Sequence, residues 1–306
     1  GSETLSKVLY PNDGTDEGRR LRLKQQHFFV SCSLQDMLRS LDQRGIPVQE
    51  FPDHWAVQLN DTHPSIAVAE LMRLLIDDKH LAWEEAWDIT CRSLAYTNHT
   101  LLPEALEKWG LQLFGSLLPR HLELIYEINR RFLQMVRIRY PGNEALLRKV
   151  SIIDEEGSKA VRMANLATVA CHHVNGVAAL HSELVRTKLL PEFAALWPEK
   201  FTNVTNGVTP RRWVALAHPS LRSLLAETIG EGWVADLDQL RQLEQFQHDG
   251  AFLERWQQTK LAAKRQLANY IHRQSGLLVD PASLFDVQVK RIHEYKRQHL
   301  NALQVI

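Results

Sequence analysis

The sequence predicts an α/β chain that is mostly helical as far as residue 200 and ends in a strand, a loop and a helix. Three observations support this class: apolar residues recur at helical spacing in several long runs, one later stretch alternates apolar and polar residues, and helical spacing returns after it. Of the 306 residues, 44% are hydrophobic and 24% charged, which is typical of a soluble globular chain with one large core or two domains.

The first helix is predicted in "PSIAVAELMRLLIDDKH", which runs from Pro64 to His80. Its apolar face consists of Ala67, Leu71, Leu74 and Leu75. We expect Asp61 or Thr62 to be the N-cap, and Pro64 suits the first turn because no amide hydrogen is needed there.

Two further amphipathic helices are predicted downstream. The first carries Trp83, Trp87, Cys91 and Leu94 along one face. The second has one polar interruption in its stripe, which consists of Leu122, Ile125, Asn129, Phe132 and Val136. Such stripes are typical of helices that face a core. We expect loops at "RYPGNE" (139–144) and "DEEGSK" (154–159), and a break at Asn175-Gly176 inside an otherwise helical run.

The pattern changes near "TNVTNGVTPRRW", where turn-forming residues precede a helix predicted to begin at Pro210 with Thr209 as its N-cap. Further on, "LFDVQVK" (284–290) alternates apolar and polar residues and predicts a strand. Helical spacing in "YKRQHLNALQVI" (295–306) predicts a final helix. In open parallel sheets ligands bind where strands end and helices begin, so this junction is a candidate anion site.

Charge and cysteine content exclude several classes of function. The 36 Lys and Arg residues balance 36 Asp and Glu residues, so no protein-wide field attracts nucleic acid or an anionic membrane. The three cysteines, Cys32, Cys91 and Cys171, lie far apart without zinc-site or redox spacing, and we therefore expect no disulfide and a reducing, cytoplasmic environment. The sequence shows neither a signal peptide nor a transmembrane run.

A local basic cluster remains in "VKRIHEYKRQ" (289–298). It contains Lys290, Arg291, Lys296 and Arg297, whose ammonium and guanidinium groups suit phosphate oxygens. The alternative is a solvated first helical turn, because clustered surface charge is common. The sequence has no glycine-rich phosphate loop of the Walker or dinucleotide type.

Two polar stretches, "NDTHP" (60–64) and "YTNHT" (96–100), could hydrogen-bond a neutral polyhydroxylated ligand. The alternative is structural: Asp61 caps a helix, while Asn98 and His99 satisfy buried backbone groups. His172-His173 and His181 have neither the spacing nor the acidic partner of a zinc motif, so we expect no metal site.

Seven stretches, in this order, closely resemble the α-glucan phosphorylases, which comprise the glycogen and maltodextrin phosphorylases. They are "NDTHPSIAVAELMRLLID", "YTNHTLLPEALEKW", "LLPRHLELIYEIN", "VNGVAALHSELV", "FTNVTNGVTPRRW", "DLDQL" and "LFDVQVKRIHEYKRQHLN". The resemblance covers the chain from "KVLYPND" onward and implies a glycosyltransferase-B-type fold. It also implies a pyridoxal-phosphate enzyme in which inorganic phosphate removes the terminal glucose of an α-1,4-glucan as glucose 1-phosphate.

By this resemblance, Arg291 and Lys296 are catalytic residues that hold substrate phosphate beside the 5′-phosphate of the cofactor. Lys290 matches a position that helps to bind the cofactor phosphate, and Trp213 matches an aromatic neighbour of the cofactor ring. Two close phosphates repel strongly unless cations screen them, so the residue types agree with this role.

On the sugar side, His99 and Asn206 resemble groups that hydrogen-bond the glucosyl unit, notably its 6-hydroxyl, and His99 counts among the catalytic residues. Asp61 resembles an acidic residue of the sugar-binding cleft. Asp13, in "LYPNDG", falls in a loop that gates the active site in the family.

The resemblance also implies a domain division and a longer parent protein. Residues 1–205 match the later part of the glucan-side N-terminal domain, and residues 206–306 match the start of the cofactor-side domain. Gly1-Ser2 looks like a cloning remnant, and the pattern stops abruptly at Val305-Ile306. No lysine here matches the Schiff-base lysine of the family, so we expect this chain alone to be inactive and its parent to be a homodimer.

Two rival functions follow from the same residues. A noncatalytic carbohydrate-binding or regulatory helical module would bind maltooligosaccharide without turnover. A nucleic-acid-binding domain would use "VKRIHEYKRQ", but zero net charge and one short basic cluster argue against it.

Overall fold

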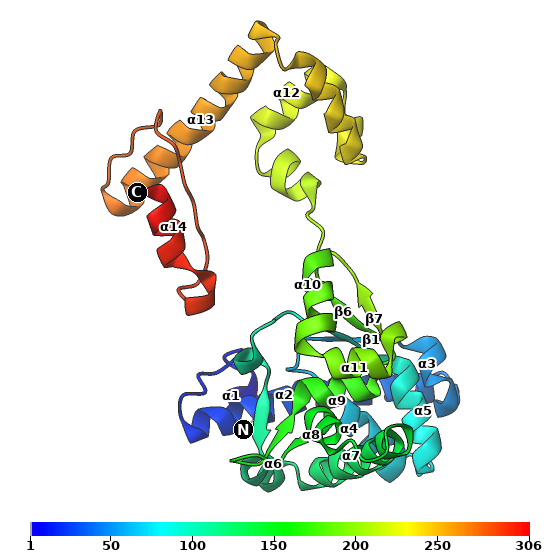
Figure 1. Ribbon diagram of the computed structural model, residues 1–306. Helices are drawn as coiled ribbons and strands as arrows, with labels where there is room; N and C mark the ends of the chain where they lie inside the picture. The colour runs from blue at the N-terminus through cyan, green and yellow to red at the C-terminus, as the bar shows by residue number, and fades with distance from the viewer. Residues whose placement is uncertain (1) are drawn as a thin grey trace. The chain divides into compact units, whose positions relative to one another are not determined.

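The computed structural model describes residues 2–306, and Gly1 of the expected cloning remnant lies outside them. The chain divides into two compact units, Gly1–Asn206 (unit 1) and Gly207–Ile306 (unit 2). Each unit is described by itself. Figure 1 shows that the sheets belong to unit 1, whereas unit 2 is built from helices and connecting segments.

Unit 1 is organised around a parallel four-stranded sheet in the order β1-β2-β6-β7. The strands are β1 (Val57–Asn60), β2 (Leu94–Thr97), β6 (Val174–Gly176) and β7 (Phe201–Asn203). Parallel strands need crossover connections, and helices supply them here. Because helices cover a parallel sheet, its central strands β2 and β6 are buried, as Leu94, Ala95 and Tyr96 of β2 are, whereas the edge strands β1 and β7 are partly exposed.

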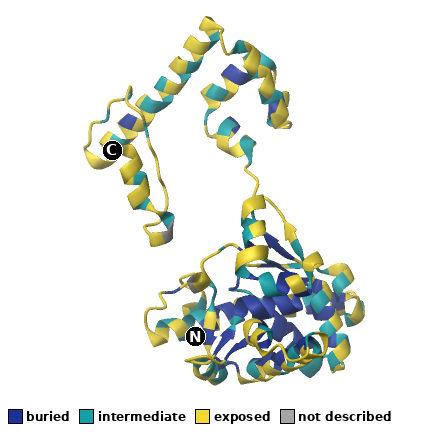
Figure 2. Cartoon of the chain, in the orientation of Figure 1, coloured by how far each residue is buried: buried dark blue, intermediate teal, exposed yellow. Residues whose placement is uncertain are grey.

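The core of unit 1 lies between this sheet and its helices (Figure 2). All eight residues of α9 (Met163–Ala170) are buried, as are the apolar residues of α4 (Ala67–Arg73). The remaining α-helices of this unit are α1 (Ser2–Ser6), α2 (Asp16–Gln43), α3 (Phe51–His54), α5 (Trp83–Ser93), α6 (Leu111–Leu117), α7 (Pro119–Arg139), α8 (Glu144–Val150), α10 (Ala179–Leu184) and α11 (Pro191–Leu196). π-Helical turns lie at Leu74–Asp78 and Val185–Leu189, and 3-10 helices at Val48–Glu50, Pro103–Ala105 and Pro198–Lys200.

A small antiparallel sheet in the order β3-β5-β4 lies in the same unit. Its strands are β3 (Lys108–Gly110), β4 (Ile153–Asp154) and β5 (Ala160–Arg162). The predicted loop at 154–159 is confirmed in the main, because it joins β4 to β5, although Asp154 itself ends a strand. The strands on either side of the loop were not predicted.

Helix predictions in unit 1 were right about the faces of α4 and α7 and less accurate about ends, whereas in α5 the predicted face at Trp83, Trp87 and Cys91 is only half-buried and Ala86 and Ile89 are buried instead. The stripe of α7 is confirmed: Ile125, Asn129, Phe132 and Val136 are buried. The face at Ala67, Leu71, Leu74 and Leu75 is also buried, but α4 begins at Ala67 with Ile66 as its N-cap. The predicted cap at Asp61 or Thr62 is therefore wrong, because turns at 63–66 precede the helix.

Two other predictions in unit 1 need correction. Helix α5 ends at Ser93, and Leu94 begins strand β2 instead of continuing the stripe. Asn175-Gly176 does not interrupt a helix but lies in β6, where Tyr96 pairs with Val174 and Thr97 with Asn175. A three-residue strand buried between neighbours shows no periodicity that would separate it from a helix.

Unit 2 consists of short helices and one long one. They are the π-helical η6 (Arg211–Leu216), α12 (Pro219–Ile229), the 3-10 helices η7 (Gly232–Val234), η8 (Leu237–Phe246) and η9 (Glu294–Lys296), α13 (Gly250–Ser275) and α14 (Gln298–Val305). Ala215, Leu225 and Trp233 form its small core. The helix predicted at Pro210 is present as η6, but Thr209 contributes its backbone carbonyl to Trp213 (3.0 Å) and Pro210 is the N-cap.

The final helix is confirmed as α14, whereas the strand predicted at 284–290 is wrong. That segment is irregular, and Leu284 and Val289 are about nine-tenths exposed. A strand is stabilised by its ladder with a neighbour, and unit 2 offers no strand to pair with among its described residues. No helix within residues 2–306 combines the length and apolar character needed to cross a bilayer.

Candidate functional site

Polar residues gather where the four parallel strands of unit 1 end. Asn60 closes β1, Asn98 and His99 follow β2, Gly176 closes β6 and Asn203 closes β7. Parallel strands end at the same edge of a sheet, and that edge is where open α/β sheets bind ligands. The pairing continues past the strand ends, because Asp61 N donates to Thr97 O (3.0 Å) and Asn98 N donates to Asn175 O (2.9 Å).

The loop after β2 presents His99 on a rigid base. The buried Asn98 donates from Nδ2 to Tyr96 Oη (3.1 Å) and accepts the Thr100 amide at Oδ1 (3.1 Å). Burial raises the pKa of Tyr96, so its hydroxyl stays neutral. His99 itself is exposed, and its Nε2 contacts Asn60 Oδ1 across from β1. Asn98 thus satisfies a backbone group, as the structural alternative predicted, whereas the exposed His99 ring bonds the Asn60 side chain and not the backbone.

The turn after β6 hydrogen-bonds the backbone of Asn206, which lies after β7. Val177 O accepts the Asn206 amide (3.0 Å), and Val204 N donates to Gly176 O (3.1 Å). An ideal Cβ on Gly176 would lie 2.7 Å from Ser182 Cα and 2.4 Å from its Oγ, so this close approach requires glycine. The structure therefore brings the loops carrying His99 and Asn206 to one edge of the sheet.

Asp61 also lies at this edge, in a conformation that explains why it does not cap a helix. Its φ is 73°, in the left-handed region, and its Oδ1 accepts the amide of Thr62 (2.6 Å). Asp13 lies before α2, where its carboxylate pairs with Arg22 (2.9 Å). The same segment reaches the loop after β1, because the Tyr10 and His63 rings meet edge to face with centroids 5.0 Å apart.

The predicted phosphate-binding residues lie in unit 2. Lys290 and Arg291 are exposed in the irregular segment before η9, and Lys296 closes η9. Two glutamines shape this loop: Gln298 Nε2 donates to Arg291 O (2.9 Å), and Gln288 Nε2 donates to Lys296 O (3.3 Å). Trp213, on η6, is 65% exposed. Lys290 and Arg291 thus face solvent, Lys296 is half-buried, and one face of Trp213 is open to solvent.

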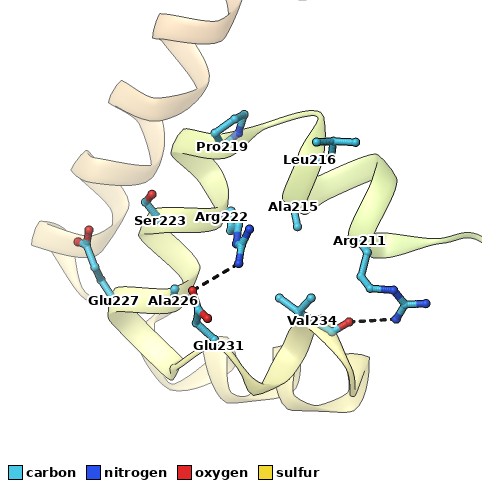
Figure 3. Close-up of a pocket in the computed structure, with 10 residues that line it drawn as sticks. All are labelled: Arg211, Ala215, Leu216, Pro219, Arg222, Ser223, Ala226, Glu227, Glu231 and Val234. Carbon is cyan, nitrogen blue, oxygen red and sulfur yellow. Dashed lines mark hydrogen bonds and ion pairs between the residues drawn. The ribbon is translucent and has the colours of Figure 1, made fainter.

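A separate pocket of about 750 Å³ lies between η6, α12 and η7 of unit 2 (Figure 3). Arg222 points toward Glu231 (3.5 Å), and Arg211 donates to Val234 O (3.3 Å). None of the predicted site residues lines this pocket. Both arginines are already engaged at its wall, so we assign it no chemistry.

Sequence reasoning missed a buried polar cluster between α2, α4 and α7. Glu70 is fully buried and accepts from Ser31 Oγ (2.6 Å), Arg73 Nε (2.9 Å) and His121 Nε2 (2.6 Å). Burial favours the neutral acid, but these hydrogen bonds prevail and hold the pKa of Glu70 far below its ordinary value. The available signal was a lone glutamate inside the apolar run "AVAELM".

The same cluster contains a possible ligand set for a metal ion. His27, Glu70 and His121 place one ligand atom each within 4.8 Å of the others. However, Arg73 already bonds both carboxylate oxygens, at 2.9 and 3.1 Å, so a cation would have to displace a guanidinium. The arrangement is that of a satisfied buried ion-pair network, and we assign no metal to it.

Comparison with known proteins gives a consistent result. The family model for carbohydrate phosphorylase matches residues 1–306. The chain is 60% identical over 305 residues to a glycogen phosphorylase of Synechocystis, covering all of this chain and 36% of the relative. It is 51% identical to a glycogen phosphorylase of Chlamydia pneumoniae and 50% identical to the human muscle form, in each case spanning 37% of the relative. The chain thus spans little more than a third of the length of these relatives.

Proposed function

This chain belongs to the carbohydrate phosphorylase family, and from that premise we propose that it is part of an α-1,4-glucan phosphorylase. The protein that contains it, called here the full-length protein, uses inorganic phosphate to remove the terminal glucose of glycogen or maltodextrin as glucose 1-phosphate. The observation that carries this proposal is the convergence of Asn60, His99 and Asn206 at the carboxyl edge of a parallel sheet in a chain of this family.

The proposal includes a glycosyltransferase-B-type architecture. Residues 1–205 belong to the glucan-side domain, and residues 206–306 begin the cofactor-side domain. The parallel sheet of unit 1 and the separation of the chain after Asn206 support this division. The residues proposed to bind sugar lie in unit 1, and those proposed to bind phosphate lie in unit 2.

In unit 1 the residues proposed for the sugar side are two neutral hydrogen-bonding groups and two carboxylates. The His99 ring and the Asn206 amide orient the glucosyl unit through its hydroxyls, Asp61 supplies an acidic group beside them, and Asp13 belongs to the gating segment. Such groups suit a polyhydroxylated ligand, because imidazole and amide groups can each donate and accept, and carboxylates accept from hydroxyls. Orientation of the glucosyl carbon toward phosphate is a positioning effect, which accounts for a large part of many enzymatic rate enhancements.

In unit 2 the cationic loop at 290–296 fits a pair of phosphates. Arg291 and Lys296 would neutralise the substrate phosphate, Lys290 would hold the phosphate of pyridoxal 5′-phosphate, and the exposed face of Trp213 would lie beside its ring. The cofactor, when bound, supplies a second phosphate that takes part in proton transfer. Arg291 and Lys296 stabilise charge as the substrate phosphate protonates the leaving oxygen and then captures an oxocarbenium-like glucosyl carbon.

The remaining parts of the proposal concern partners and location. The partners are α-1,4-glucan, inorganic phosphate and a second copy of the full-length protein, with no role for nucleic acid or membrane. We place the protein in the cytoplasm, since Cys32, Cys91 and Cys171 are all free thiols.

The test is phosphate-dependent release of glucose 1-phosphate from maltodextrin by the full-length protein with added pyridoxal phosphate. Arg291→Ala should lower turnover by about 10²–10³-fold, as loss of one preorganised electrostatic contact does. Arg273→Ala, in the last turn of α13, is the matched control and should be silent. Unchanged phosphate dependence in Arg291→Ala would contradict the assigned role. Maltodextrin binding without turnover would favour a noncatalytic glucan-binding module.

A further inference from the structure

His181 of α10 lies between the two loops assigned to glucose. Its Nδ1 accepts the amide of Val177 (3.0 Å), and Val177 O in turn accepts the amide of Asn206 (3.0 Å). Strand β6 also bonds the loop after β2, because Asn175 O accepts the amide of Asn98 (2.9 Å), the residue before His99. The imidazole therefore holds the turn after β6, whose backbone and preceding strand bond both Asn206 and the residue before His99.

These contacts determine the tautomer of His181. A backbone amide can only donate, so Nδ1 must be unprotonated and the neutral ring must carry its proton on Nε2. That Nε2 is buried and makes no hydrogen bond of good geometry among the described residues, with the Thr100 backbone as its polar neighbour. Burial lowers the pKa of His181, Thr100 opposes this and the nearby His99 adds to it, so the neutral ring is favoured.

The turn beside His181 is tightly packed. An ideal Cβ on Gly176 would lie 2.9 Å from His181 Nδ1 and 2.7 Å from Ser182 Cα, so the ring sits directly against the backbone of the turn. Ser182 Oγ donates to Asn203 Oδ1 (2.7 Å), which ties the same helix to the end of β7. A change in the imidazole must therefore move the turn that holds Asn206.

We propose that His181 is a positioning residue that fixes the spacing of His99 and Asn206 for binding of the glucosyl unit. The inference rests on the proposed function, and it assigns His181 no contact with reacting atoms. Protonation of Nδ1 would remove the acceptor for Val177 and loosen the turn. The titratable group acting on the ring from outside its helix is His99, and Glu183 on the helix itself is paired with Arg186 (2.9 Å).

The experiment compares His181→Ala, His181→Asn and the control His54→Ala in the full-length protein. His54 is an exposed histidine of the same unit whose ion contact is with Glu50. We expect His181→Ala to raise KM for maltodextrin about tenfold, the effect of losing one well-placed hydrogen bond, and to leave KM for phosphate unchanged. An asparagine can accept the Val177 amide through Oδ1, so His181→Asn should restore most of the affinity. Wild-type maltodextrin affinity should fall on acidification as the His181 ring becomes protonated, and His181→Asn should show less of this fall.

Two results would overturn the inference. One is a maltodextrin KM in correctly folded His181→Ala equal to that of His54→Ala. The other is an Nδ1-protonated neutral ring for His181, observed by ¹⁵N NMR of the imidazole, because that tautomer cannot accept the Val177 amide. The failure of the proposed function has a different signature: the wild-type protein would release no glucose 1-phosphate, whereas the tautomer measurement would still decide the geometry of His181.

Discussion

Replacement of the buried Glu70 by glutamine tests how unit 1 is stabilised. The amide keeps the shape of the carboxylate but removes its charge. Its oxygen can still accept from Ser31 Oγ and Arg73 Nη2, which lie 2.6 and 3.1 Å from Oε1. Its NH₂ group, however, then faces two donors, Arg73 Nε and His121 Nε2, which lie 2.9 and 2.6 Å from Oε2.

The loss of unfolding free energy in Glu70→Gln depends on the partners that Arg73 keeps. Breaking a buried ion pair by removing one partner costs about 3–5 kcal/mol. Arg73 keeps Asp78 as a partner (3.2 Å) and is 23% exposed, so water offsets part of the loss and the low end, about 3 kcal/mol, applies. For a unit of this size, that corresponds to a fall in Tm of about 6–12 °C.

The assay is thermal and urea unfolding of the chain at neutral pH, followed by circular dichroism. Glu123→Gln on α7 is the matched control, because its pair with Arg120 (2.9 Å) leaves the two side chains 67% and 44% exposed. Such an exposed pair contributes less than about 1 kcal/mol. If Glu70→Gln lowers stability no more than Glu123→Gln does, the cluster is not the stabilising network argued here.

The same variant predicts a pH dependence. Because the folded-state pKa of Glu70 lies below its ordinary value of 4.5, its contribution is complete above that pH and is lost as the pH falls further. Wild-type stability should therefore decline more steeply than that of Glu70→Gln between about pH 5 and pH 3. Parallel stability curves for the two proteins over that range would refute the assigned direction of the pKa shift.

Three further outcomes are expected. Gly176→Ala should lower the free energy of unfolding by about 1–3 kcal/mol in urea, because its Cβ would meet the Ser182 backbone. Gly110→Ala is the control and should be nearly neutral, because its Cβ would meet nothing within 4 Å. Equal effects of the two substitutions would contradict the tight packing of the turn at Gly176. Asn129→Ala should lower the free energy of unfolding by about 1–3 kcal/mol, because the buried Ile152 amide (2.8 Å) loses its acceptor. If its effect is no greater than that of replacing Asn143, the exposed N-cap of α8, the hydrogen bond is not the stabilising contact. Iodoacetamide at pH 8 should alkylate the exposed Cys32 before Cys91, because burial raises the pKa of Cys91 to about 12. Equal alkylation rates of the two cysteines, measured by mass spectrometry, would refute the burial of Cys91.

Local periodicity was sufficient to predict the buried faces of α4 and α7, whereas the two longest helices, α2 and α13, were not predicted. The stripe of α7 and the apolar face at 67–75 were identified correctly because amphipathic spacing records which side of a helix is buried. The long motifs that resemble glucan phosphorylases were also readable, and the family match over residues 1–306 confirms that resemblance. The roles of Arg291, Lys296, His99 and Asn206 remain proposals.

Strand pairing and side-chain contacts between distant segments could not be predicted from the sequence. Strand β6 has three residues, and its identity depends on β2 and β7, which lie far from it in the sequence. Conversely, "LFDVQVK" has the alternation of a strand but no partner within the described part of unit 2. Glu70 is part of a buried network because α2 and α7 pack against α4 and place Ser31 and His121 within hydrogen-bond distance of its carboxylate. Helical faces follow from nearest-neighbour spacing along the chain, whereas sheets, ion networks and the His181 link depend on which remote segments meet, and only the folded structure decides that.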